Sequence, residues 1–127
     1  MTREAISTAN APAAVGPYSQ AIVAGDMVFC AGQIPLDPQT GEIAGSTIEE
    51  QTERVLRNVG AVLDAAGVTY ADVVKTTVFM ADLGEFTAMN GVYATFFPDP
   101  PPARSTFGVA ALPRGAKVEI ECIARRP

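Results

Sequence analysis

The chain has 127 residues, of which 48% are hydrophobic and 18% are charged, and its formal net charge is −5. This length is typical of one domain, and the apolar fraction excludes a disordered chain. We therefore expect residues 1–127 to form a single domain with its own core. The apolar runs are much shorter than the ~20 residues that cross a membrane as a helix, so we expect no membrane partner.

Histidine is absent from the sequence, which excludes Ser-His-Asp and Cys-His catalysis and every zinc site with a histidine ligand. The two cysteines, Cys30 and Cys122, cannot complete a four-cysteine site, so we expect no metal. We interpret them as buried structural thiols rather than as a disulfide or a reactive thiol. The N-terminal residues lack the features of a secretory signal, which favours a reducing, cytoplasmic location.

The acidic charge balance argues against polyanionic partners. The sequence has two lysines, Lys75 and Lys117, and its seven arginines are scattered. Proteins that bind nucleic acids carry a basic patch, because neutralised phosphates supply much of the affinity. We therefore expect no nucleic-acid partner.

Proline and glycine separate short segments that have the periodicity of strands or helices. In chain order we predict a strand in Val15–Val23, a strand at Met27–Gln33, a loop at Ile34–Gly45, a helix over Ile48–Ala66, a strand at Asp72–Met80, a helix over Phe86–Phe97, and strands at Ala103–Ala111 and Ala116–Ala124. Ser46 or Thr47 can cap the first helix together with a glutamate three residues later. Asp82 can cap the second helix, whose apolar stripe we interpret as core.

These elements predict an α+β fold with a single mixed β-sheet and two helices packed on one face. Two amphipathic helices can cover one face of such a sheet and no more. However, Met27–Gln33 is uncharged on both sides, and Asp72–Met80 has one interior charge, Lys75. We therefore expect further copies of the chain to cover the other face in a homo-oligomer.

Arg104 is the first candidate functional residue. It follows a proline-rich turn and begins an uncharged strand, on which it shares a face with Thr106 and Gly108. A buried guanidinium needs an anion, and its planar fork matches a carboxylate. A surface arginine at a strand end, or one paired with a nearby glutamate, explains the same residue without a ligand.

Glu119 is the second candidate. Together with Lys117 and Glu121 it alternates with apolar residues, a pattern that is also typical of a solvated sheet face. If the last two predicted strands form a hairpin, their register decides whether Arg104 shares a face with the glutamates. The connecting loop does not determine that register.

Three further residues lie where a ligand can be contacted. Gly16 and Pro17 set a rigid turn that can present Tyr18, and Gly32 lets a ligand approach the backbone closely. Asn90 lies on the second predicted helix beside core positions. Ordinary loop geometry also explains Tyr18 and Gly32 without a ligand, and a polar position on a helix flank explains Asn90. The sequence has no glycine-rich phosphate loop and no carboxylate cluster with metal-ligand spacing.

Four segments in order give the sequence a resemblance to a known family: ANAPAAVGPYSQA, AGQIPLDPQTGEI, VVKTTVFMADLGEF and PPARSTFGVAALPRGAKVEIE. They cover almost the whole chain, which closely resembles the RidA (YjgF) family of reactive-intermediate imine/enamine deaminases. The resemblance implies a fold like that of the small bacterial chorismate mutases, assembled as a homotrimer with pockets between subunits. It also implies hydrolysis of 2-aminoacrylate and related 2-imino acids to 2-oxo acids and ammonia, without cofactor or metal.

The family motifs imply a role for each candidate residue. The arginine that binds the substrate carboxylate corresponds to Arg104, and the glutamate associated with the hydrolytic water corresponds to Glu119. The substrate-binding positions of the family correspond to Tyr18, Gly32 and Asn90, which match the pocket tyrosine, the backbone contact and the helix asparagine.

The sequence departs from the family pattern at three places. Thr106 stands where cysteine is typical, so a small polar substrate-binding group still lies beside Arg104. Ala31 lacks the hydroxyl of the usual serine, and the loop before PPARS is shorter than in common members. These departures concern substrate preference more than reaction type.

Two other classes of function stay open. One is a non-catalytic trimer that binds small carboxylates or holds partner proteins as a chaperone does. The other is an endoribonuclease or translation inhibitor, as relatives have been described. The net charge and the lack of histidine argue against RNA cleavage, and the presence of both Arg104 and Glu119 favours catalysis over binding alone.

Overall fold

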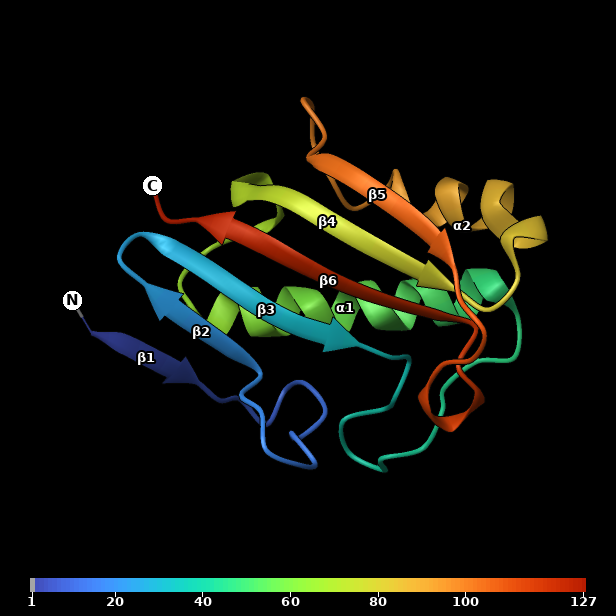
Figure 1. The fold of residues 1–127 in the computed structure, drawn as a ribbon, viewed down its shortest axis with the longest axis horizontal. Coiled ribbons are helices and arrows are strands. Elements are labelled where there is room, and N and C mark those ends of the chain that lie inside the picture. Colours follow the sequence, from blue (N-terminus) through green and yellow to red (C-terminus); the bar gives the residue numbers. More distant parts are fainter. Residues whose placement is uncertain (1) are drawn as a thin grey trace.

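The computed structural model describes residues 2–127. In chain order, its strands and α-helices are β1 (Arg3–Ile6), β2 (Ala21–Ala24), β3 (Met27–Gln33), α1 (Ile48–Ala65), β4 (Val73–Met80), α2 (Phe86–Tyr93), β5 (Ala103–Gly108) and β6 (Val118–Arg125). The strands form one sheet in the order β1-β2-β3-β6-β4-β5. Strands β4 and β5 are parallel, and the other neighbouring pairs are antiparallel. Both helices lie on the same side of this mixed sheet (Figure 1), which confirms the predicted α+β architecture.

The N-terminal strands differ from the prediction. The sequence pattern did not predict β1. All residues of this strand except Ile6 are exposed, so its sequence lacks the alternation of apolar and polar residues that indicates a strand. β2 begins at Ala21 rather than near Val15, because Gly16 has a φ of 129° and turns the chain before it. β3, in contrast, spans the predicted range Met27–Gln33.

Both predicted helices are present, but the second ends at Tyr93 rather than at Phe97. Of the two possible capping boxes, α1 uses Thr47 and Glu50: the Glu50 amide donates to Thr47 Oγ1 at 3.1 Å, and the Thr47 amide donates to Glu50 Oε1 at 3.2 Å. The prediction that Asp82 caps the second helix is wrong. Its carboxylate accepts from the Gly84 amide at 2.8 Å and caps a short 3-10 turn that precedes α2.

The last two strands do not form a hairpin. β5 pairs with β4 at the edge of the sheet, whereas β6 lies between β3 and β4. The burial of the two strands gives the physical reason. Every second residue of β6 is buried against the helices, which suits a central strand, while no residue of β5 is fully buried, which suits an edge strand.

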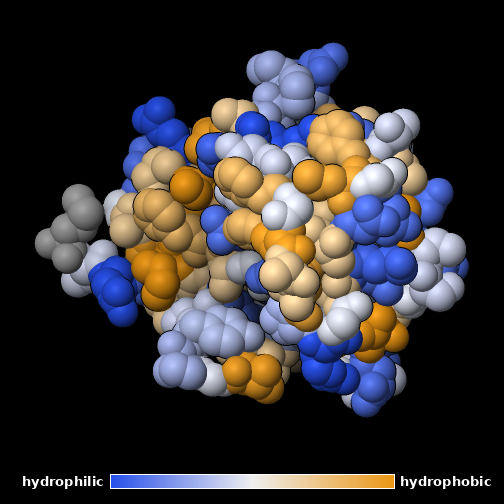
Figure 2. Space-filling view, turned by 45° about the vertical axis from the view of Figure 1, so that its right-hand side comes forward, coloured by the Kyte–Doolittle hydropathy of each residue, from blue (hydrophilic) through white to orange (hydrophobic). Residues whose placement is uncertain are grey.

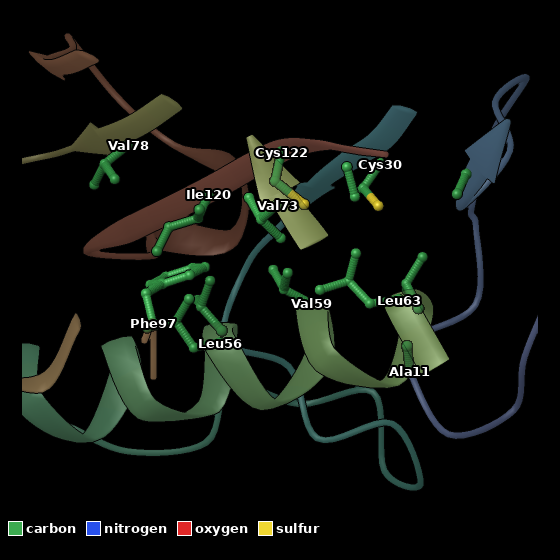
Figure 3. Packing of buried hydrophobic residues seen from close by; sticks show 14 of the residues in the cluster. Ala11, Cys30, Leu56, Val59, Leu63, Val73, Val78, Phe97, Ile120 and Cys122 are labelled. Atoms are coloured by element: carbon green, nitrogen blue, oxygen red, sulfur yellow. The ribbon is translucent and has the colours of Figure 1, made fainter. Parts of the chain in front are cut away.

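The core lies between the sheet and the helices (Figure 3). Leu56, Val59 and Leu63 of α1 pack toward β6, which contributes Ile120 and Cys122. Cys30 lies directly opposite Cys122 in the β3–β6 ladder, and both are buried free thiols, as predicted. Within residues 2–127, no helix combines the length and the apolar character needed to cross a bilayer.

Residues 2–127 leave part of the other face of the sheet exposed. Phe29 of β3 and Phe107 of β5 alternate with helix-facing residues and are 45% and 52% exposed. Phe107 stacks on Phe79 of β4, with 6.3 Å between the ring centroids. Orange and pale residues occupy much of the middle of the molecule in Figure 2, with blue residues mostly nearer its margin. The exposed apolar side chains agree with the expectation that this face has a partner.

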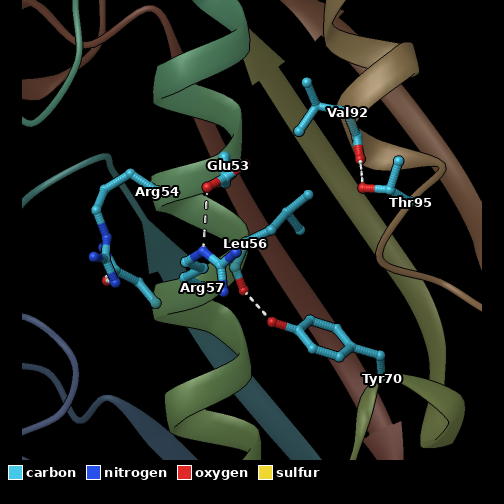
Figure 4. Close-up of polar contacts among 8 residues, drawn as sticks. Glu53, Arg54, Leu56, Arg57, Tyr70, Val92 and Thr95 are labelled. Carbon is cyan, nitrogen blue, oxygen red and sulfur yellow. Dashed lines mark hydrogen bonds and ion pairs between the residues drawn. The ribbon is translucent and has the colours of Figure 1, made fainter.

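Tyr70 joins α1 to the segment before β4. Its hydroxyl donates to the Leu56 carbonyl at 2.6 Å, beside the exposed Glu53–Arg57 ion pair on α1 (Figure 4). A Cβ at Gly60 would overlap this hydroxyl, so the helix carries glycine where the tyrosine approaches. Glycine within a helix costs about 1 kcal/mol relative to alanine, and the contact with Tyr70 gives this cost a structural reason.

We expect Gly60→Ala to lower the free energy of unfolding by about 1–3 kcal/mol, because the methyl group displaces Tyr70 and breaks its hydrogen bond. Gly91→Ala is the matched control, since a Cβ at this exposed position of α2 meets no atom within 4 Å. It should be neutral or raise stability by up to about 1 kcal/mol. Urea unfolding of both variants tests the difference, and equal stability changes would contradict the role of Gly60.

Candidate active site

Arg104 points toward the helices from the beginning of β5. The parallel register places it opposite Thr76 of β4, whose side chain is buried. Arg104 Nη1 donates to Asn90 Oδ1 at 2.7 Å. The guanidinium carbon lies 4.8 Å from the ring centre of Tyr93 and 5.5 Å from that of Phe86. α2 thus supplies an amide acceptor and two aromatic rings that together hold one guanidinium.

No carboxylate within residues 2–127 forms an ion pair with Arg104, although it is half-buried. Asn90 is its one side-chain hydrogen-bond partner in this part of the chain. The interpretation of Arg104 as the partner of a nearby glutamate is therefore wrong among residues 2–127. The remaining N–H donors are available to an anion.

A cleft of about 250 Å³ opens beside this guanidinium. Its lining includes Asn90, Tyr93 and Arg104, together with Asp99 and Pro101 from the proline-rich turn. The cleft can accommodate a small ligand only, because a drug-sized pocket is typically larger than about 300 Å³.

Tyr93 holds a position that sequence reasoning assigned to the core alone. It is buried, and its hydroxyl shares a 2.7 Å hydrogen bond with the Thr76 hydroxyl. Burial is the main cause that raises the pKa of Tyr93, so the phenol stays neutral. Its ring also forms one wall against Arg104. The spacing of Asn90 and Tyr93, three residues apart on one helix face, is the sequence signal that could have predicted this arrangement.

Thr106 lies on the same strand face as Arg104, two residues further along β5 and opposite Val78. Its Oγ1 is buried and has no hydrogen-bond partner within residues 2–127. A buried hydroxyl without a hydrogen-bond partner is energetically costly. This atom is therefore a free donor or acceptor on β5, the strand that carries Arg104.

Glu119 faces the opposite side of the sheet. Its neighbours Val118 and Ile120 are buried against the helices, so its own side chain projects from the other face, opposite Phe79 of β4. Its carboxylate lies against Gly32 of β3, where a Cβ would overlap it. The ladder between β3 and β6 is irregular between Cys30 and Gln33, so Gly32 occupies a bulge that admits the carboxylate.

The electrostatics of Glu119 suit a proton acceptor. Partial burial, and then the negative charge of Glu121 on the same strand face, raise the pKa of the Glu119 carboxyl above its usual range. A carboxylate with a raised pKa is a stronger base at neutral pH than an ordinary glutamate.

Tyr18 borders a second cleft of about 350 Å³, which shares Gly32 with the Glu119 carboxylate. The walls are mostly apolar, and include Pro12, Val15, Ile34, Leu36 and Pro113. Gly16 adopts a φ of 129°, and its carbonyl accepts from the Tyr18 amide at 2.9 Å, so the turn presents a half-exposed tyrosine ring. We call this the Tyr18 cleft.

The predicted site residues therefore form two groups on opposite faces of the sheet. Arg104, Asn90 and Thr106 lie on the helix side, whereas Glu119 and its neighbour Gly32 lie on the other side, with Tyr18 at the shared cleft. Arg104 and Glu119 therefore cannot act as a pair within a single chain. Side chains alternate between the two faces of a sheet, and the strand registers place these two side chains on opposite faces. Within residues 2–127, no group of histidine, cysteine, aspartate or glutamate residues could hold a metal ion.

Residues 8–126 match the family model described as Endoribonuclease L-PSP. The chain belongs to this family, which includes the RidA (YjgF) proteins, and the resemblance seen in the sequence is thereby confirmed.

Two of the similar proteins carry the names of deaminases. A Homo sapiens protein named 2-iminobutanoate/2-iminopropanoate deaminase is 43% identical over 98% of this chain and 90% of its own length. An Arabidopsis thaliana protein named Reactive Intermediate Deaminase A, chloroplastic, is 55% identical over 96% of this chain, which covers 65% of the plant protein. The crystal structure of E. coli TdcF with bound serine has a TM-score of 0.93 and 46% identity, covering 98% of this chain and 99% of TdcF.

Replacing Glu121 by glutamine should lower the pKa of Glu119 toward the usual glutamate value, because it removes a like charge that favours the protonated form. Carbon-13 NMR titration of the side-chain carboxyls measures this shift. Glu53→Gln, at an exposed position on α1 paired with Arg57, is the control and should leave Glu119 unchanged. A Glu119 pKa that does not move in Glu121→Gln contradicts the electrostatic account.

Proposed function

We propose that this chain is a deaminase that hydrolyses 2-aminoacrylate and related 2-imino acids to 2-oxo acids and ammonia, without cofactor or metal. The observation that carries the proposal is the Arg104 guanidinium, which is held in place and forms no ion pair with a carboxylate of residues 2–127. Such a group is suited to the carboxylate of a small acid. The names of the human and plant relatives and the serine bound to TdcF support a small amino-acid-like substrate.

We propose that the active site is completed between subunits of a homotrimer with a chorismate-mutase-like arrangement. Arg104 and Glu119 point to opposite sides of the sheet, so a site that uses both needs Arg104 of one copy and Glu119 of another. Cyclic symmetry creates this pairing at each subunit contact. The exposed Phe29 and Phe107 supply apolar area for the contact.

In this mechanism Arg104 binds the substrate carboxylate and fixes the imine carbon in position. Positioning of this kind contributes up to ~7–11 kcal/mol to lowering a barrier in ideal cases. 2-Aminoacrylate first tautomerises to the imine, whose protonated form is the electrophile. Glu119 accepts a proton from a water molecule as the water oxygen bonds to the imine carbon and the C=N π electrons move to the nitrogen. Glu119 returns this proton to the nitrogen of the carbinolamine. The C–N bond then breaks as the hydroxyl oxygen forms the carbonyl, the hydroxyl proton passes through Glu119 to the departing ammonia, and the 2-oxo acid and ammonium leave. General acid–base assistance is typically worth ~10²–10⁴-fold.

The remaining candidate residues bind and orient the substrate. Asn90 keeps Arg104 in place through its 2.7 Å hydrogen bond, and Thr106 offers its unpartnered hydroxyl beside it. Tyr18 closes one side of the Tyr18 cleft, and Gly32 leaves space for the Glu119 carboxylate. Since Glu119 must be ionised to accept a proton, activity should fall as the pH decreases through its raised pKa.

We further propose that residues 1–127 act as one RidA-like domain in the cytoplasm, with no nucleic-acid or membrane partner. The family description names an endoribonuclease, but the chain has a net charge of −5 and no histidine. Both features disfavour binding and acid–base cleavage of RNA.

The proposed reaction is tested with imino acids generated in situ by an amino-acid oxidase, with oxo-acid formation followed over time. The wild-type protein should accelerate hydrolysis, whereas Arg104→Lys should lower the rate at least ~100-fold with the fold intact, because lysine keeps the charge but loses the planar fork. Arg104→Ala should lose as much or more.

Arg57→Lys is the matched control for that experiment, since it makes the same change at an exposed arginine of α1. It should retain full activity. If the wild type does not accelerate hydrolysis of small or large imino acids, a non-catalytic carboxylate-binding trimer replaces the deaminase. Normal turnover by Arg104→Lys removes Arg104 from its assigned role.

The shared site is tested by mixing two inactive variants, Arg104→Ala and Glu119→Gln. After co-refolding at equal amounts, random assembly places an intact Arg104 beside an intact Glu119 in about a quarter of sites, so activity should return to roughly that fraction. Each variant refolded alone is the control. Mixtures that stay inactive, although mixed trimers form, would show that each site uses residues of one chain only.

A further inference from the structure

Buried side-chain amides connect loops to the rest of the fold at three positions. Gln20, Gln51 and Asn58 are 3%, 5% and 0% exposed, and each bonds to backbone groups of other segments. Burying an amide is unfavourable unless its hydrogen bonds are satisfied. What each amide holds in place therefore indicates its role.

Gln20 fastens the N-terminal loop. Its Oε1 accepts from the Thr8 amide at 2.6 Å, and its Nε2 donates to the carbonyls of Thr8 at 3.1 Å and Pro12 at 2.8 Å. Its own backbone carbonyl accepts from the Ala31 amide at 2.9 Å, directly before Gly32. One residue thus joins the Pro12 wall of the Tyr18 cleft to the strand that carries Gly32.

Asn58 fastens the opposite wall. Its Nδ2 donates to the carbonyls of Ile34 at 3.2 Å and Leu36 at 2.9 Å, and both of these residues line the Tyr18 cleft. Its Oδ1 accepts two N–H bonds from Arg54, at 3.1 and 2.8 Å, which fix the orientation of the amide.

We propose that Gln20 and Asn58 are positioning residues that preform the Tyr18 cleft by holding its two loop walls on either side of Gly32. Neither side chain is among those that line the cleft, so both act through the loops that they bind. The inference rests on the proposed function, because it assigns the cleft to the substrate whose hydrolytic water gives a proton to Glu119. A preformed wall lowers the ordering cost of binding, and its loss weakens affinity more than it slows the chemical step.

Gln51 provides a matched control. It is as buried as Gln20 and also bridges two segments, donating to the Gly45 carbonyl at 3.1 Å and accepting from the Lys117 amide at 2.9 Å. Neither Gly45 nor Lys117 lines the Tyr18 cleft. A purely structural role predicts the same consequences for Gln20→Met and Gln51→Met, whereas the positioning role predicts a difference.

The experiment compares Gln20→Met, Asn58→Leu and Gln51→Met with the wild type by three measurements. Calorimetry gives the Kd for a 2-oxo acid product, 2-oxobutanoate; oxidase-coupled kinetics give kcat; and mass spectrometry gives amide hydrogen exchange. Gln20→Met should raise the Kd about fivefold or more with kcat changed less than about twofold. It should also accelerate exchange in residues 8–18 about tenfold. Asn58→Leu should raise the Kd likewise and accelerate exchange in residues 34–45.

The Gln51→Met control should lose stability without a change in Kd or in exchange of residues 8–18. Equal effects of Gln20→Met and Gln51→Met, or an unchanged Kd in Gln20→Met, overturn the proposal.

Gln20→Glu keeps the acceptor for Thr8 but loses both donors, so it should reproduce the Gln20→Met result. If neither Gln20 variant folds, the role of Gln20 is structural and the proposal fails. A wild type without deaminase activity refutes the proposed function instead, and product affinity and exchange still decide whether these amides preform the cleft.

Discussion

The contact between Arg104 and α2 is the interaction on which the functional organisation depends. A guanidinium bonded to Asn90 and packed on the ring of Tyr93 keeps a defined orientation, and no carboxylate among residues 2–127 forms an ion pair with it. In the proposed function, the carboxylate of the ligand supplies this ion pair and offsets the energetic cost of a half-buried charge. Tyr93 is in turn held by Thr76, so the core of the fold directly supports the binding group.

The sheet imposes a second constraint, since side chains alternate between its faces. Arg104 shares the helix side with the core, and Glu119 shares the other side with Phe29 and Phe107. The proposed mechanism, which uses both groups, therefore requires the proposed assembly, and the exposed apolar side chains lie on the same face as the proposed base. In that proposal, the subunit contact and the completed site share one surface.

Much of the fold could be predicted from local pattern. β3 and α1 follow from an uncharged apolar run and from a 3.6-residue periodicity with its capping box. Prediction failed where local signals were weak or ambiguous: β1 has only Ile6 buried, and Asp82 suits either a helix cap or the 3-10 turn that it actually caps. Among site residues, Tyr93 was predicted only as core. Its helical spacing with apolar residues indicates burial, and this spacing is the same whether or not the ring also packs on Arg104.

The sequence by itself determined the secondary structure of the central elements, the chemistry available without histidine, and the family, through motifs that lie in a fixed order. Only the tertiary structure decided that β6 lies between β3 and β4, that Arg104 and Glu119 face opposite ways, and that Gly32 admits a carboxylate. The physical reason is that helix and strand periodicity arise from neighbours along the chain. Strand order and register depend instead on packing between segments that are distant in sequence, which no local pattern encodes.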